Sequence, residues 1–117
     1  MNRFGWLLLA APLATTAEAG EPAHAPDPVV GNVIALNVCS ACHVVASAQP
    51  EPPILRPPAP TFRSIANRRG ITEEWLRGFV TTTHRTVETP GHMPNPNLMD
   101  AQVDDVAAYI MTLRRKR

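Results

Sequence analysis

The sequence predicts an all-α domain with proline-rich loops. Apolar residues recur at helical spacing in several segments, and most of the 13 prolines lie between those segments. No stretch alternates polar and apolar residues as a half-buried strand would, and no internal repeat is present. We therefore expect one small domain of three to five short helices.

The N-terminus has the three parts of an export signal. Arg3 supplies a positive charge, and residues 4–14 form an apolar run. Ala17-Glu18-Ala19 then fits the small-x-small pattern at which signal peptides are cut. Residues 1–19 are therefore interpreted as a signal peptide.

The apolar run is too short to anchor the chain in a membrane. It contains Pro12 and falls well short of the roughly 20 residues that span a bilayer. We expect cleavage after Ala19, or after Ala25 at a second small-x-small pattern. The mature chain, residues 20–117, would then be periplasmic, without a transmembrane segment.

Asp27 and Pro28 predict the start of the first helix. Aspartate is a favoured N-cap residue, and proline is well suited to the first helical position. Gly31 inside this helix costs about 1 kcal/mol relative to alanine unless close packing requires it. We expect the buried face to carry the apolar residues at helical spacing, which are Val29, Val33, Leu36 and Cys39.

The two cysteines of the chain stand in the run Cys39-Ser40-Ala41-Cys42-His43. A C-x-x-C-H run is typical of a c-type haem attachment site. Two thiols at this spacing can lie on one helical turn and reach the two vinyl groups of one haem, while His43 binds the iron. The motif therefore predicts one covalently attached haem.

A zinc site, a redox-active cysteine pair or a structural disulfide would explain the C-x-x-C-H run less well than a haem site does. A zinc site needs four ligands, and His24, His84 and His92 show no paired spacing. A thioredoxin-like redox pair would accompany a βαβ pattern, which is absent from the sequence. A structural disulfide would leave His43 without a role.

The segment 50–60 is too rich in proline to form a helix and is expected to be extended. The apolar residues Ile54, Leu55 and Phe62 are expected to lay this segment over a hydrophobic surface. Thr61 then predicts the cap of a short helix that ends near Asn67.

Two further helices follow. Thr72 begins one whose first turn is acidic, as the helix dipole favours, and Asp100 is expected to be the N-cap of the last one. The apolar face of the former is expected to comprise Trp75, Leu76, Phe79 and Val80. That of the latter is expected to comprise Val103, Val106, Ala107, Ile110 and Leu113.

Charge gives no indication of a nucleic-acid partner. The 11 lysines and arginines nearly balance the 10 aspartates and glutamates. The basic residues 114–117 are interpreted as a solvated helix end that complements the dipole, rather than as a docking patch.

Together these residues resemble the class I c-type cytochromes, in particular small bacterial periplasmic ones. The resemblance extends over the mature chain and rests on C-x-x-C-H after the first helix, the Met93-Pro94 loop and the closing helix. It implies the cytochrome c fold, with its loops wrapped around one covalent haem. It also implies that Tyr109 packs over Gly31 at a helix crossing, and that the carbonyl of Pro60 accepts a hydrogen bond from the His43 imidazole.

The chain departs from the family at Ala35, where a bulky or aromatic residue is usual. This departure suggests a thinner contact between the first and last helices.

The second axial ligand is expected to be Met93. It sits in an irregular loop, matches the family's Met-Pro position, and would raise the potential relative to a second histidine. Met99, next to the cap of the last helix, is expected to be a hydrophobic staple or a core contact instead, and Met111 a core contact. His92 and His84 are alternatives that would give a bis-histidine site.

With both axial positions filled, the iron would exchange single electrons and bind no substrate. We expect a monomeric carrier, not an enzyme, that binds its redox partners transiently. The donor would be a dehydrogenase or quinol oxidoreductase, and the acceptor a terminal oxidase or reductase. Alternatives are a dedicated haem subunit of one such complex, or, if Met93 does not bind iron, a haem enzyme or gas sensor.

Overall fold

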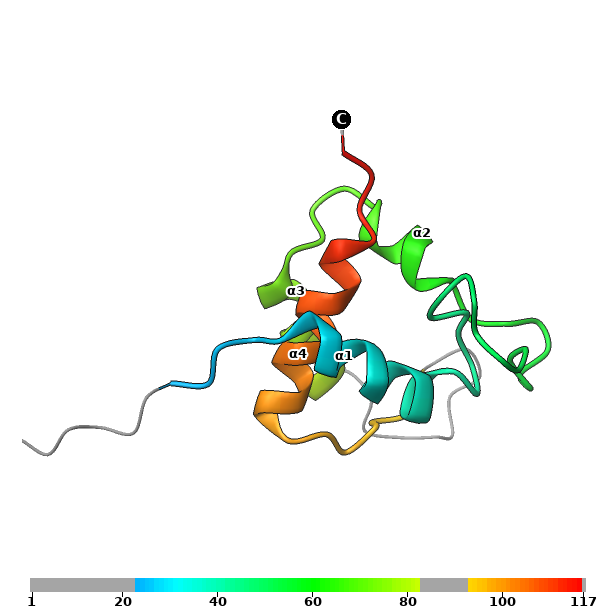
Figure 1. Ribbon diagram of the computed structural model, residues 1–117, viewed down its shortest axis with the longest axis horizontal. Coiled ribbons are helices and arrows are strands. Elements are labelled where there is room, and N and C mark those ends of the chain that lie inside the picture. The colour runs from blue at the N-terminus through cyan, green and yellow to red at the C-terminus, as the bar shows by residue number, and fades with distance from the viewer. Residues whose placement is uncertain (1–22, 83–92, 117) are drawn as a thin grey trace, which may run out of the picture.

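The computed structural model describes residues 23–82 and 93–116, and all regular structure within them is helical (Figure 1). This confirms the predicted fold class. None of the helices in these ranges has both the length and the apolar character of a membrane span. The elements are α1 (Pro28–Ile34), its π-helical continuation η1 (Ala35–Cys39), α2 (Phe62–Ala66), α3 (Glu73–Thr82) and α4 (Asp100–Thr112).

Side-chain caps begin the helices at the predicted places. The Asp27 carboxylate accepts a hydrogen bond from the Val29 N–H at 2.8 Å, with proline at the first position of α1. The Thr61 hydroxyl accepts one from the Ser64 N–H at 3.0 Å ahead of α2. Each bond satisfies a backbone donor that would otherwise lack an intrahelical partner.

The start of α4 differs from the prediction by one residue. Asp100 is the first helical residue, and Met99 takes the N-cap position with extended backbone. The side chain of Gln102 reaches back and accepts the Met99 N–H at 3.0 Å. Glutamine can cap from the third position in this way, and Asp100 keeps its favourable place at the positive end of the helix dipole.

Helices α1 and α4 cross in direct backbone contact at Gly31 (Figure 1). A Cβ atom at this position would lie 1.9 Å from the carbonyl oxygen of Asp105 and 2.9 Å from Cβ of Tyr109. Only glycine permits this approach. Gly31 and Tyr109 therefore meet, as the resemblance implied.

The predicted buried face of α1 and its continuation η1 is confirmed only in part, because Leu36 and Cys39 pack partly buried against the core whereas the two valines do not. Val29 and Val33 are 72% and 55% exposed, whereas Gly31 and Ala35, four residues apart, are buried. A close backbone crossing requires small residues on the contacting side, and this turns the valines toward solvent. Ala35 is fully buried in the same core cluster as the apolar residues of α4.

Helix α4 supplies much of the core, and its predicted apolar stripe is confirmed. Four of the five stripe residues are at most 4% exposed and the last, Leu113, packs partly buried against the core. Helix α2 contributes Phe62 and Ala66, and α3 contributes Leu76. The predicted face of α3 is only partly buried, because Trp75 is 45% exposed and stacks on Phe79 with ring centroids 5.0 Å apart.

Candidate functional site

The C-x-x-C-H run forms a tight turn at the end of η1. The backbone N–H of Ser40 donates to the Ala35 carbonyl at 3.1 Å, which is the wide spacing of a π-helix. The N–H groups of Cys42 and His43 both donate to the Cys39 carbonyl, at 3.2 and 2.9 Å. The turn therefore holds both thiols and the imidazole within one small segment.

Both cysteines are free thiols with partly buried side chains. Burial, with a smaller contribution from the neighbouring Cys42, raises the pKa of the Cys39 thiol to about 11. At neutral pH this sulfur is therefore protonated. A neutral thiol can add across a vinyl group, and no described disulfide competes for it.

His43 is buried, with 8% of its surface exposed, and its ring is oriented by one hydrogen bond. The Nδ1–H donates to the Pro60 carbonyl at 2.6 Å. This assigns the lone pair to Nε2, for which no described residue supplies a hydrogen-bond partner. An imidazole with its Nδ1–H on a carbonyl and a free Nε2 is the usual form of a metal-ligating histidine.

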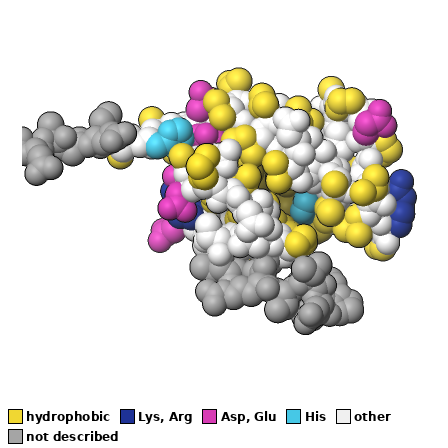
Figure 2. Space-filling view, turned by 90° about the horizontal axis from the view of Figure 1, so that it is seen from below, with side chains coloured by type: hydrophobic (Ala, Val, Ile, Leu, Met, Phe, Trp, Pro, Cys, Tyr) yellow, Lys and Arg dark blue, Asp and Glu magenta, His cyan; other side chains and the backbone are white. Residues whose placement is uncertain are grey.

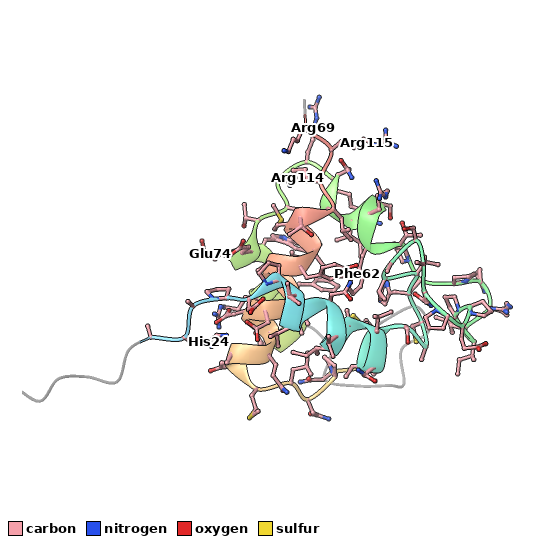
Figure 3. All side chains as sticks on the ribbon, viewed as in Figure 1. His24, Phe62, Arg69, Glu74, Arg114 and Arg115 are labelled. Atoms are coloured by element: carbon pink, nitrogen blue, oxygen red, sulfur yellow. The ribbon has the colours of Figure 1, made fainter. Side chains whose placement is uncertain are left out.

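One aromatic ring, that of Phe62, lies beside the histidine, and Tyr109 packs against Phe62 in turn. The Phe62 side chain points inward between α2 and α4 (Figure 3). Its ring centroid lies 5.4 Å from that of His43 and 6.4 Å from that of Tyr109. The Tyr109 hydroxyl donates to the Val45 carbonyl at 2.8 Å and thereby ties the chain just after His43 to α4. The imidazole is thus held from its own turn, from Pro60 and through α4.

The proline-rich segment is fastened to the attachment turn by its backbone. The N–H groups of Ile54 and Leu55 donate to the Ala41 carbonyl at 2.9 and 3.3 Å, and that of Ala59 donates to the Cys42 carbonyl at 2.9 Å. The expectation that apolar side chains lay this segment over a hydrophobic surface is confirmed for Phe62, which is 4% exposed in the core. It is wrong for Ile54 and Leu55, which are 81% and 44% exposed. Extended backbone offers unpaired N–H groups, and here those groups make the contact.

Sequence reasoning missed Gln49, which braces the same turn. Its side-chain oxygen accepts the Val45 N–H at 2.9 Å. Its amide nitrogen donates to the carbonyls of Ser40 at 3.4 Å and Glu51 at 2.6 Å. A lone glutamine in a loop has no sequence pattern that distinguishes it from a solvated one, so no signal could have identified it.

Met93 opens the second described range and is half-buried. Next in the chain, the Asn95 side chain accepts the Asn97 N–H at 2.8 Å, and Asn97 has a positive φ of 54°. This is an ordinary asparagine turn. The competing ligands His84 and His92 lie outside the described residues.

The other two methionines differ from each other. Met99 was expected to be a hydrophobic staple or a core contact, and this is wrong, because it is 68% exposed at the N-cap of α4. Met111 packs partly buried against the core, as expected.

These residues fit a covalently attached haem. Two thiols stand on one turn beside a buried imidazole whose Nε2 is available to a metal. The face shown in Figure 2 offers mostly hydrophobic and uncharged side chains over its middle, with charged side chains toward its two ends. Such a surface suits a large apolar cofactor.

Comparison with known proteins agrees with this geometry. The family model described as Cytochrome c matches residues 29–114. Cytochrome c-552 of Bradyrhizobium diazoefficiens is 31% identical over 108 residues, which cover 92% of this chain and 89% of that protein. No solved structure gives a significant match. The helical fold, the C-x-x-C-H turn and the family match together show that the chain belongs to the cytochrome c family.

Proposed function

We propose that this chain is a periplasmic electron carrier whose haem is attached through Cys39 and Cys42 and whose iron is held by His43 and Met93. The observation that supports this most is the His43 ring, which is buried and donates through Nδ1 to the Pro60 carbonyl at 2.6 Å. None of the described residues bonds its Nε2. The haem supplies a one-electron ferric–ferrous couple. The protein orients the ligand, excludes water from it and strengthens it through the Pro60 hydrogen bond.

The surroundings of the three downstream methionines favour Met93 as the iron ligand. Met99 is 68% exposed, and Met111 is packed in the last turns of α4. Met93 is half-buried in irregular backbone, where a side chain can be aimed at a cofactor without distorting a helix. A thioether ligand would also raise the potential relative to a second histidine.

The ligand set is tested by the ferric spectrum of protein produced in a host that attaches c-type haem. A pyridine haemochrome assay should give one haem per chain. The wild type should show the weak methionine-to-iron band in the far red, which Met93→Ala removes and the matched Met99→Ala retains. Loss of the band in Met99→Ala instead, or a high-spin ferric haem in the wild type at neutral pH, would overturn the proposal. The latter result would favour a gas-binding or enzymatic haem.

We also propose that residues 1–19 are an export signal cut after Ala19. Cleavage after Ala25 would remove His24, whose imidazole contacts the buried Asp105 carboxylate at 2.7 Å. A mature chain that starts at Gly20 keeps this contact. The intact mass of the exported protein distinguishes the two sites, and a chain that starts at Pro26 would contradict the assignment.

The expected partners are a dehydrogenase or quinol oxidoreductase as donor and a terminal oxidase or reductase as acceptor. Redox encounters of this kind bury small interfaces and are transient. A free carrier should elute as a monomer and should not copurify with a partner at moderate salt. Stable copurification with one oxidoreductase would instead identify a dedicated haem subunit.

A further inference from the structure

Two basic segments far apart in the sequence meet at one end of the molecule. The α2–α3 loop carries Arg68 and Arg69, and the chain after α4 carries Arg115 and Lys116. Figure 3 shows Arg69 and Arg115 at the same end, together with Arg114. We call the four residues Arg68, Arg69, Arg115 and Lys116 the basic end.

The basic end is held together by hydrogen bonds. The Arg114 guanidinium donates to the carbonyls of Ala66 at 2.8 Å and Ile71 at 2.6 Å, on either side of the loop. The N–H of Arg115 donates to the Asn67 side chain at 3.0 Å. The Arg114 side chain therefore joins the two segments, and the side chains of the four residues of the basic end are exposed.

The four cations are available to a partner. All four are exposed, and none forms an ion pair or a side-chain hydrogen bond with any residue that the structure describes. The acidic residues of α4 lie in its first half, at Asp100, Asp104 and Asp105. Charge is thus separated along α4, with the positive side chains beyond its C-terminal end.

We propose that the basic end is a docking surface for an acidic protein surface. Three of its four residues are arginines, whose planar guanidinium groups pair with carboxylates through two hydrogen bonds. A membrane is the poorer fit, because none of the large exposed hydrophobic residues of the described chain lies in the loop after α2 or after α4. Basic residues without apolar neighbours hold a bilayer only weakly.

This surface is separate from the attachment turn. Figure 1 shows the C-terminal end of α4 at the top and the end of α1, which leads into the turn, at the lower right. A partner bound at the basic end would be attracted by its positive charge and would leave the attachment turn uncovered. The proposal rests on the proposed function only in taking the partner to be a redox protein.

The test uses the haem-loaded protein and two variants with the same net charge. Arg69→Gln/Arg115→Gln removes two charges from the basic end. Val29→Glu/Val33→Glu adds two negative charges on the exposed face of α1, where the side chains are 72% and 55% exposed. The probe is a short polyglutamate peptide, titrated at low ionic strength and followed by amide chemical shifts.

The wild type should bind the peptide with shifts centred on residues 67–71 and 113–116. Binding should weaken about fivefold or more in the arginine variant, which is the effect expected of two exposed charge pairs. It should weaken less than about twofold in the valine variant. Equal losses in both variants, or shifts centred elsewhere, would overturn the proposal.

Vesicles of phosphatidylglycerol, with phosphatidylcholine vesicles as reference, test the membrane alternative. Vesicle binding through the same residues without peptide binding would overturn the assignment to a protein partner. The ferric spectrum and reduction potential should be the same in both variants and the wild type. An abnormal wild-type spectrum would count against the proposed function, whereas the binding result would still stand.

Discussion

The carboxylate of Asp105 and the imidazole of His24 lie 2.7 Å apart, although 81 positions separate them in the sequence. Asp105 is 3% exposed and also accepts the Asp27 N–H at 2.8 Å. An ionised carboxylate can only accept, so Nε2 of His24 carries the proton of this bond. The contact joins the segment ahead of α1 to the middle of α4, close to the Gly31 crossing.

This arrangement makes the stability of the protein depend on pH. Burial alone would raise the pKa of Asp105, but the Asp27 N–H and His24 outweigh it and hold the pKa below its usual value. A lowered pKa in the folded state adds stability above the unfolded-state pKa, and that stability is lost as pH falls through the folded-state value. Asp105→Asn should therefore lower the free energy of unfolding by about 1–2 kcal/mol at pH 7. The difference from wild type should shrink below about pH 4.

Denaturant unfolding of the haem-loaded protein across this pH range measures the effect. The matched control is Asp104→Asn on the same helix, whose carboxylate forms an ion pair with Arg77 near the surface. That change should cost at most about 1 kcal/mol. The same pH-dependent difference in both variants would show that burial of Asp105 is not its cause.

Gly31→Ala should destabilise the protein by about 2–4 kcal/mol. The new Cβ would meet the Asp105 carbonyl oxygen at 1.9 Å, and a backbone carbonyl within a helix cannot rotate away as a side chain can. The two helices would have to separate. Thermal unfolding of the haem-loaded variant measures this loss.

Gly78→Ala is the control for the glycine change. Gly78 lies within α3, and a Cβ there would meet no described atom within 4 Å. Alanine should therefore stabilise the helix by up to about 1 kcal/mol. Two substitutions of the same chemistry should thus act with opposite sign, and a tolerated Gly31→Ala would contradict the close crossing.

Local signals predicted much of this fold, because caps and attachment motifs act within a few residues. Asp27, Thr61 and the apolar stripe of α4 all behave as expected. The errors at Val29 and Val33 have a long-range cause. Apolar periodicity shows that one face of a helix is hydrophobic, but the partner at Gly31 decides which side is buried.

The residues of the candidate site also fall into those that local sequence predicts and those that depend on distant contacts. The cysteines and His43 could be recognised from spacing alone, since the chemistry requires them to be adjacent. Gln49 and the Tyr109 bond to Val45 could not, because each depends on where distant backbone comes to lie. The His24 contact with Asp105 is of the same kind.

The Cys39 thiol should react slowly in the protein before haem is attached. With its pKa raised to about 11, it is almost fully protonated at pH 8.5, where an ordinary cysteine is about half ionised. Alkylation by iodoacetamide proceeds through the thiolate. The measurement uses a Cys42→Ser variant of the apoprotein, in which burial remains the main cause of the raised Cys39 pKa. We expect alkylation of Cys39 in this variant to be roughly 100-fold slower than in the same chain unfolded in guanidinium. Far-ultraviolet circular dichroism establishes that the helices are formed, and equal rates in both states would contradict the burial of this sulfur.

Tyr109→Phe should cost about 1–2 kcal/mol of unfolding free energy, although it removes a single oxygen atom. The hydroxyl donates to the Val45 carbonyl in a side chain that is 7% exposed, so its loss leaves a buried acceptor without its donor. The ring keeps its contact with Phe62, so packing should be unchanged. Ser64→Ala, which removes an exposed hydroxyl that donates to the Thr61 carbonyl, should cost less than about 0.5 kcal/mol.

Because Val45 follows His43 by two residues, the Tyr109 variant should also loosen the histidine turn. Faster amide hydrogen exchange at residues 43–45 than in Ser64→Ala would show this loosening, and equal exchange in the two variants would confine the role of Tyr109 to global stability.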